Sequence, residues 1–354
     1  MKRRTLAKLL SASAVLTLGG VGYTARARSR NPYYQGPVTD HFDGARFQNP
    51  GPWRDKALGE FLRWQFGGGR ADWPDSYPSP FADTPPERVS GLRVTLIGHA
   101  SVLIQVAGLN VLIDPVWAKR ASPSALVGPK RVNPPGVAFE ALPPIDAVLI
   151  THNHYDHLDL KTVARLWKRD EPRILAPLGN DAIIQGFDER VAVETLDWGQ
   201  SAALSDAVTV HMTPAIHWSA RRMNDRRMAL WCAYVLTTPA GVIHHVGDSG
   251  YGDGAIFRAV REAFGPPRLA LLPIGAYEPR WFMEPFHMNP ADAVRAHLEV
   301  GARHSIATHH SYFRLADDGF DSPAKLLADA RAAAGIPPED FRVLDVGETV
   351  VLRA

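Results

Sequence analysis

The run Thr151-His152-Asn153-His154-Tyr155-Asp156-His157 places four side chains of metal-binding type within six positions. It follows an apolar segment, Ala147–Ile150, whose length and composition predict a buried strand. The first two histidines of the run lie two apart, so on extended backbone both imidazoles point to the same side and one metal ion can take both. The aspartate and the last histidine then offer a carboxylate and a third imidazole to a second ion. A solvated loop with chance histidines would seldom show this pattern directly after a strand.

Three later loops each offer one more residue of this type, namely His217, Asp248 and His309. Each follows a short apolar run, and the glycines beside Asp248 allow the backbone to approach closely. A carboxylate can bridge two cations, and imidazole and carboxylate suit zinc, iron or manganese, with zinc the usual metal for hydrolysis. Two such ions would lower the pKa of a shared water enough to give hydroxide near neutral pH. The sequence therefore predicts a metal-dependent hydrolase with a two-metal cluster.

The pattern of apolar runs predicts a mixed α/β (α+β) fold. Short β-branched runs at 94–97, 102–106 and 111–113 are separated by glycines, as antiparallel hairpins require. Later strands and helices alternate along the chain. The further strands are expected at 147–150, 174–176, 208–212, 231–236, 242–246 and 269–272, and the helices at 160–168, 255–264, 291–300 and 324–334. This mixture predicts two packed sheets with helices on the outer faces.

Two segments are expected to precede the catalytic domain, which spans residues 89–354. Residues 31–88 are rich in Pro, Gly and aromatic residues, with a short amphipathic helix predicted between Trp53 and Phe66. They are interpreted as an arm lying across the core; a flexible linker is the competing interpretation, which the tryptophans disfavour. Residues 1–30 combine a basic start with a short apolar stretch, which predicts a signal peptide or a membrane anchor. Arg3-Arg4 resembles a twin-arginine export signal, so we expect export to the bacterial periplasm or cell envelope.

Charge and cysteine content exclude several classes of function. Seven of the 39 basic residues lie in residues 1–30, which leaves 32 basic against 37 acidic side chains in the rest of the chain. This balance argues against a nucleic-acid binder. Cys232 is the single cysteine, so an intramolecular disulfide and a thiolate metal cage are both impossible.

Four stretches resemble N-acylphosphatidylethanolamine-hydrolysing phospholipase D, a family with the metallo-β-lactamase fold. They are Pro129-Lys130-Arg131, 142–150, 247–251 and 274–283. The similarity runs from about Asp40 to the C-terminus. It implies an αββα sandwich with the site at one edge. It also implies a phosphodiesterase of phospholipase D type that cleaves N-acylphosphatidylethanolamine to N-acylethanolamine and phosphatidate, works at a membrane surface and forms a homodimer.

The same resemblance assigns roles to individual residues. His152, His154 and His217 would bind one zinc ion, Asp156, His157 and His309 a second, and Asp248 would bridge the two. With Asp156 and Asp248, His287 completes the predicted catalytic set, because it matches a family histidine near the reacting phosphate. It would orient the phosphate or protonate the leaving alkoxide. A structural role at a helix entry is the alternative for His287.

The chain departs from the family pattern at three places. Ser249 stands where the family usually has Thr, and His310-Ser311 replaces a Trp-Gly pair after the last metal histidine, which leaves His310 as a rival to His309. The export signal is the third departure.

Several other polar and aromatic residues are left with two interpretations each. His99 and Asp114 are expected either to support a ligand or to be structural polar groups. His244 and His245 are predicted to be strand residues rather than ligands. The aromatic residues of the arm, with Trp218 and Trp281, either line an acyl-chain groove or pack in the core.

Two alternative functions remain open from the sequence. A related hydrolase of this fold could act on a lactone, a β-lactam or a soluble phosphodiester. A non-catalytic lipid-binding or scaffold protein is disfavoured because all seven ligand-type residues are present.

Overall fold

The computed structural model describes residues 31–51 and 54–352, and its centre is a pair of seven-stranded mixed sheets. The predicted export signal or anchor over residues 1–30 lies outside the described residues. The first sheet has the strand order β14-β1-β2-β3-β4-β5-β6 and the second β13-β12-β11-β10-β9-β8-β7. The strands of the first sheet are β14 (Thr349–Leu352), β1 (Leu92–Gly98), β2 (Ser101–Val106), β3 (Leu109–Ile113), β4 (Ala147–Leu149), β5 (Arg173–Pro177) and β6 (Glu194–Leu196). Those of the second are β13 (Phe341–Arg342), β12 (His304–Thr308), β11 (Leu269–Pro273), β10 (Gly241–His245), β9 (Ala233–Thr238), β8 (Thr209–Thr213) and β7 (Ser201–Ala203).

Each sheet is antiparallel in one half and parallel in the other. In the first sheet β14, β1, β2 and β3 pair antiparallel, whereas β3 to β6 pair parallel. In the second, β7 to β10 are antiparallel and β10 to β13 are parallel. The hairpins predicted at the start of the domain are therefore confirmed. The parallel pairs need crossover connections, and helices fill most of them.

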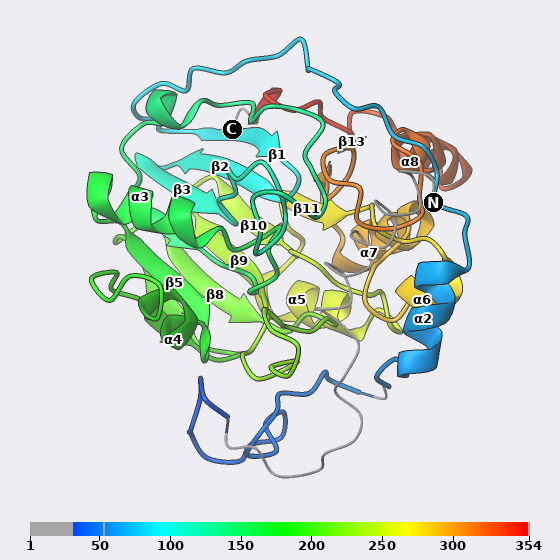
Figure 1. The fold of residues 1–354 in the computed structure, drawn as a ribbon. Coiled ribbons are helices and arrows are strands. Elements are labelled where there is room, and N and C mark those ends of the chain that lie inside the picture. The colour runs from blue at the N-terminus through cyan, green and yellow to red at the C-terminus, as the bar shows by residue number, and fades with distance from the viewer. Residues whose placement is uncertain (1–30, 52–53, 353–354) are drawn as a thin grey trace.

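Three apolar layers hold the sandwich together. Figure 1 shows the two sheets and the helices that cover them. Side chains from both sheets, such as Ile104 and Leu236, form the layer between them. A second layer lies under helices α3 (Leu160–Asp170) and α4 (Asn180–Gln185) on the first sheet. The third lies under α5 (Ala255–Phe264), α7 (Pro290–Val300) and α8 (Ser322–Ala333) on the second. The predicted order of helices, two sheets and helices is confirmed.

The segment before β1 packs on the catalytic core. Phe42 and Phe47 are buried against Leu230 and Trp231 of the loop before β9. Further along, α2 (Leu58–Phe66) contacts α6 (Arg280–Met283), and Figure 1 shows the two helices side by side. The helix predicted between 53 and 66 is thus present in its second part. Within the described residues, no helix is long and apolar enough to cross a membrane.

Candidate metal centre

The residues of the predicted metal motif lie at the ends of strands on one edge of the sandwich. His152 to His157 follow β4, and the other three candidates follow β8, β10 and β12. Because β10 and β12 lie in one sheet on either side of β11, with all three parallel, their carboxyl ends meet at the same edge. The structure brings all seven candidate side chains together there. All seven are buried or nearly so.

Three imidazoles form the first group of donors. Nε2 of His152 lies 3.0 Å from Nδ1 of His154, which in turn lies 3.2 Å from Nε2 of His217. Oδ2 of Asp248 is 3.9 Å from the His152 nitrogen and 3.7 Å from the His217 nitrogen. A tetrahedral ion with bonds of about 2.0–2.1 Å separates its ligand atoms by about 3.4 Å. The four atoms therefore have the spacing of one coordination shell.

The second group shares the same carboxylate oxygen. Oδ2 of Asp248 lies 3.3 Å from Nε2 of His157 and 3.1 Å from Nε2 of His309. Oδ2 of Asp156 lies 3.5 Å and 3.3 Å from the same two nitrogens. Asp248 thus contacts both groups, as a bridging carboxylate requires. His310 takes no part, because its Nδ1 faces the Ser311 hydroxyl at 3.1 Å and its side chain is outside both groups.

Buried donor atoms without hydrogen bonds mark where cations fit. Nε2 of His157 and Nε2 of His309 are both buried and make no hydrogen bond among the described residues, although each lies close to two carboxylates. Oδ1 of Asp248 is buried without a partner as well. Buried polar atoms are nearly always paired in proteins. Imidazole nitrogens and carboxylate oxygens that converge at these distances are a donor set suited to metal ions.

The protonation states of the first group suit metal binding. Burial holds the pKa of His154 at about 3 and lowers that of His152 and of His217 well below the usual value for histidine. These imidazoles are therefore neutral at physiological pH, which is the form that binds a metal.

In the second group, the carboxylates stabilise a positive charge on the histidines. Burial lowers the pKa of His309, but Asp248 and Asp156 outweigh it and raise the pKa to about 9. The pKa of His157 is likewise raised, against the effect of burial, by Asp248, Asp156 and Asp114. A site that holds a proton this strongly also attracts a metal cation, which replaces the proton.

Hydrogen bonds behind the cluster fix which nitrogen of each ring faces it. Nδ1 of His157 donates to Oδ2 of Asp114 at 2.7 Å, and Nδ1 of His217 donates to the Phe286 carbonyl at 3.1 Å. Asp114 also accepts bonds from the Thr151 amide and hydroxyl, so its carboxylate is held rigidly. Of the two interpretations left open for Asp114, the geometry supports that of a residue supporting a ligand. His99 does the same for Asp156, with its Nε2 2.9 Å from Oδ2.

Asn49 of the N-terminal arm holds the loop that carries His217, and sequence reasoning missed it. Its Nδ2 donates to the His217 carbonyl at 2.8 Å, and its Oδ1 accepts from the His217 amide at 2.9 Å and from the Trp231 indole at 3.0 Å. Asn49 is buried. The signal was weak, because a single Asn in a Pro-rich stretch without periodicity gives no hint of a partner 168 residues away.

Close backbone contacts hold the remaining loops in place. The Ser249 hydroxyl accepts from the Ile216 amide at 3.0 Å and links the Asp248 loop to the His217 loop. Gly275 lies against the His309 loop, where a Cβ atom would come within 2.0 Å of the His309 carbonyl oxygen. Ser249, which stands where the family usually has Thr, keeps the hydroxyl that accepts the Ile216 amide hydrogen bond.

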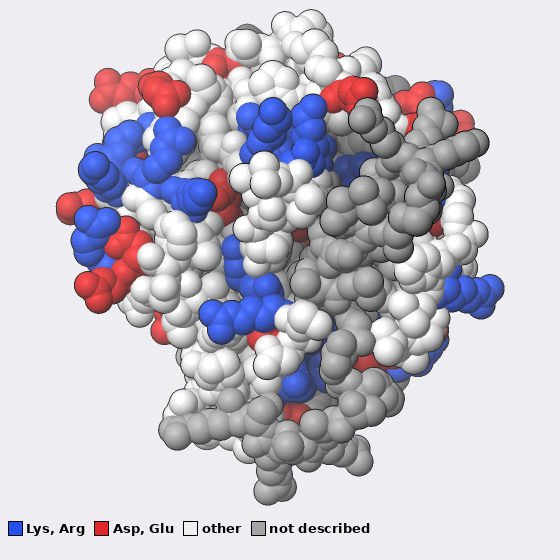
Figure 2. Space-filling view, in the orientation of Figure 1, with Lys and Arg blue, Asp and Glu red and all other residues white. Residues whose placement is uncertain are grey.

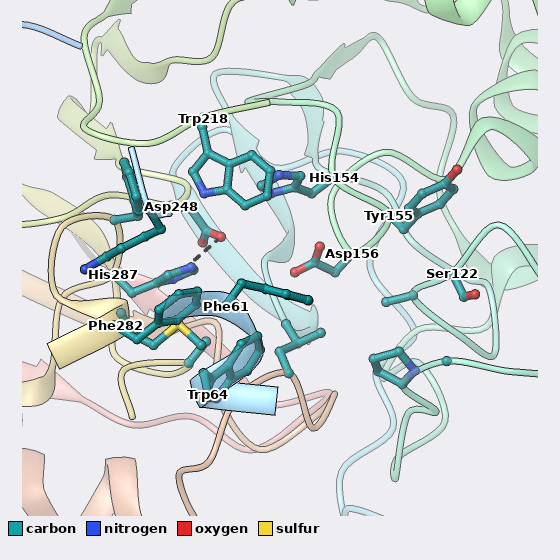
Figure 3. Close-up of a pocket in the computed structure, with 18 of the residues that line it drawn as sticks. Phe61, Trp64, Ser122, His154, Tyr155, Asp156, Trp218, Asp248, Phe282 and His287 are labelled. Carbon is teal, nitrogen blue, oxygen red and sulfur yellow. Dashed lines mark ion pairs between the residues drawn. The ribbon is translucent and has the colours of Figure 1, made fainter. Parts of the chain in front are cut away.

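A cavity of about 220 Å³ opens onto the cluster. Figure 3 shows His154, Asp156 and Asp248 on one side of it and Phe61, Trp64 and Phe282 on the other, with His287 beside Phe282. His287 Nδ1 is buried without a hydrogen bond and lies 4.0 Å from Asp248 Oδ2. Burial lowers the pKa of His287 to about 4, so its ring is neutral at pH 7.

The aromatic residues proposed for an acyl groove divide into two sets. Trp64 of the arm and Trp218 line the cavity. Trp281 does not line it, and neither does Phe66, which is 66% exposed. His244 and His245 lie in β10 as predicted, outside the metal-type clusters of the described residues.

Comparison with known proteins agrees with this geometry. Residues 109–310 match the family described as the beta-lactamase superfamily domain. The chain belongs to the metallo-β-lactamase superfamily. Its cluster of metal-type side chains fits the metal-dependent hydrolase that the sequence predicts.

Individual members of the superfamily are similar over most of the chain. An uncharacterized protein of Mycobacterium tuberculosis is 42% identical over 68% of this chain, and the match spans 64% of the relative's length. The N-acyl-phosphatidylethanolamine-hydrolyzing phospholipase D 1 of Caenorhabditis elegans is 37% identical over 73% of this chain and 75% of its own. The expected similarity to that family is therefore confirmed. Among solved structures, an isothiocyanate hydrolase from Delia radicum gut bacteria covers 74% of this chain and 100% of its own at 21% identity, with a TM-score of 0.58, which supports the fold.

Proposed function

We propose that this hydrolase is a phosphodiesterase of phospholipase D type that cleaves N-acylated ethanolamine phospholipids to N-acylethanolamine and phosphatidate. The observation that supports it most is that one cavity combines three features: cationic side chains, an aromatic wall and the cluster of metal-type residues. A phosphodiester with long acyl chains is the substrate class that needs all three. The 37% identity to the C. elegans enzyme supports the same substrate.

The seven ligand-type residues would hold two divalent cations, for which zinc is the first choice given the imidazole-rich donor set. His152, His154 and His217 would hold one and Asp156, His157 and His309 the other, with Asp248 shared, in line with the two groups of distances. When bound, such a pair supplies Lewis acidity and an activated water.

The chain's own side chains would bind and orient the phosphodiester. Lys56 and Arg226 both line the cavity and carry the positive charge that a phosphate anion needs. Arg226 lies 3.7 Å above the Trp218 ring, and its Nε donates to Asp55 at 3.0 Å, so its guanidinium is held in one orientation. The neutral His287 ring would donate one hydrogen bond to a phosphoryl oxygen. This favours its orienting role over protonation of the leaving group.

The apolar wall would bind acyl chains and exclude water from the cluster. Phe61, Trp64 and Phe282 lie on one side, with the Trp64 and Phe282 rings stacked at 5.0 Å. In the reaction the bond between phosphorus and the ethanolamine oxygen breaks. Water supplies the oxygen to phosphatidate and the proton to the departing alkoxide.

The decisive experiment is metal analysis of the purified protein, combined with mass spectrometry of products from mixed phospholipids. We expect N-acylethanolamine and phosphatidate, and loss of both products after chelation. Hydrolysis of a chromogenic β-lactam without release of N-acylethanolamine would refute the proposed substrate.

A pair of tryptophan variants tests the apolar wall. Trp64→Ala should raise KM for a long-chain substrate and leave a short-chain analogue unaffected. Trp73→Ala is the matched control, because Trp73 is an arm residue outside the cavity lining. Equal effects of both variants would contradict a role of this wall in binding acyl chains.

We also propose that the enzyme acts outside the cytoplasm at a membrane surface and as a homodimer. The basic start and apolar stretch of residues 1–30 support export or anchoring, and the lipid substrate supports the membrane surface. Replacing Arg3 and Arg4 with lysine should leave the protein in the cytoplasm, as cell fractionation would show.

A further inference from the structure

The loop between β3 and β4 carries a Lys-Arg pair on each side of a small, apolar tip. Its sequence is Lys119-Arg120-Ala-Ser-Pro-Ser-Ala-Leu-Val-Gly-Pro-Lys130-Arg131, hereafter the 119–131 loop. Arg120 and Lys130 form an antiparallel bridge, and the Arg131 amide donates to the Lys119 carbonyl at 3.1 Å. The two basic pairs therefore lie side by side at the base of the loop.

The tip of the 119–131 loop exposes apolar surface. Leu126 is 83% exposed, more than any other large hydrophobic side chain among the described residues, and its neighbour Val127 is 37% exposed. Local hydrogen bonds order the backbone of the tip. The Ser122 hydroxyl accepts from the Ser124 amide, and the Ser124 hydroxyl accepts from the Leu126 amide. The fold thus holds an apolar group in solvent, away from any core.

The basic residues at the base carry charge that the protein does not neutralise. No ion pair joins any of the four side chains to a carboxylate in the part of the chain that the structure describes. Both lysines are exposed, whereas the partly buried Arg120 and Arg131 donate to the Gly128 and Trp117 carbonyls, which are neutral and leave the positive charges unpaired. Residues 31–354 hold more acidic than basic side chains, so this concentration of cations is local. On the face shown in Figure 2, Lys and Arg gather in several groups, some beside Asp and Glu and some bordered by uncharged residues.

One side of the 119–131 loop is also a wall of the cavity. Ala121, Ser122, Pro123, Gly128 and Pro129 line it. Figure 3 places Ser122 across the cavity from His287. A surface that contacts the tip of this loop will therefore lie next to the cavity.

We propose that the 119–131 loop docks the enzyme on an anionic lipid bilayer. Leu126 and Val127 enter the acyl region, and the two Lys-Arg pairs contact the headgroup phosphates, since basic residues next to a short apolar segment favour the interface. The inference rests on the proposed lipid function in one respect: docking would bring the cavity to its lipid substrate. The docking itself needs no substrate.

The chain's single cysteine allows a direct test on the full-length protein. Cys232 is buried, so a thiol-reactive NBD dye will label an introduced cysteine instead. Leu126→Cys places the dye at the tip, and Leu326→Cys places it on α8 as a control, because Leu326 is an exposed leucine (45%) that does not line the cavity. Vesicles of phosphatidylcholine and phosphatidylglycerol, which lack the N-acylated substrate, should shift the emission of the tip dye to the blue and leave that of the control dye unchanged.

Vesicle flotation gives the second measurement. Leu126→Glu should lower partitioning into these vesicles by about tenfold or more, the loss expected for one leucine side chain. Lys130→Gln should lower it by about fivefold, and Leu326→Glu should leave it unchanged. A tip dye that does not respond, or that responds no more than the control dye, overturns the inference. So does a Leu126→Glu variant that changes only the oligomeric state in size-exclusion chromatography.

A protein that inserts its tip but does not cleave N-acylated phospholipid keeps the docking inference and refutes the proposed substrate.

Discussion

Replacing Asn49 with alanine should weaken the first metal group while leaving the second intact. The substitution removes the bonds to the His217 amide and carbonyl, at 2.9 Å and 2.8 Å, in a residue that is buried. The Trp231 indole keeps its bond to the Ala215 carbonyl at 2.9 Å, so it adds little to the loss. Leaving a buried polar group without its partner costs about 1–3 kcal/mol, which gives roughly 2–6 kcal/mol for the two His217 groups.

Part of this loss should appear as weaker metal binding, because the His217 loop is no longer held in place. Loss of a residue that orients a ligand typically lowers metal affinity about 10–100-fold. Zinc titration against a chromogenic chelator will measure the two binding steps separately. We expect one step to weaken by this factor and the other to keep its affinity.

Asn180→Ala is the matched control for a general loss of stability. Asn180 is buried as well, and its Nδ2 donates to the Pro177 and Leu230 carbonyls at 2.7 Å and 3.0 Å, yet it bonds to none of the seven ligand-type residues. Both variants should melt at lower temperature, and only Asn49→Ala should lose zinc affinity. Equal zinc affinity in the two variants would show that Asn49 stabilises the fold without positioning His217.

Four further substitutions test the site and its surroundings. Asp248→Asn and His154→Ala should each abolish turnover with little loss of folding, and near-normal activity in both would refute the assigned cluster. His287→Ala should lower kcat by about 10²–10³-fold, the loss expected for one hydrogen-bond donor to the reacting group, with the metal content unchanged, so a loss of metal would instead place His287 among the ligands. Burial lowers the pKa of His244 to about 4, so the unfolded chain takes up a proton below about pH 6.5 and the folded one does not. Stability should therefore fall by up to ~3 kcal/mol between pH 6.5 and pH 4, and denaturant unfolding of His244→Leu should show a shallower pH dependence.

Local sequence was enough to predict most of the fold. The hairpins of β1 to β3 and the helices α3, α5, α7 and α8 were all expected within a few residues of their observed bounds. Their apolar periodicity is strong because each has one face on a core layer. The short strands β6, β7, β13 and β14 and the helix α4 were missed. In β14, for example, four residues give no periodicity and pair with β1 only through the tertiary fold.

For the metal centre, the sequence determined which residues are of ligand type and that strand ends would carry them. It did so because metal donors are few in kind and because the spacing of His152 and His154 fixes their direction on extended backbone. The tertiary structure decided what sequence cannot encode locally. It brought His217, Asp248 and His309 to one edge, separated His309 from His310, and placed Asn49 behind a ligand far along the chain. These outcomes depend on the packing of the two sheets and of the arm, where contacts join residues with no pattern in common.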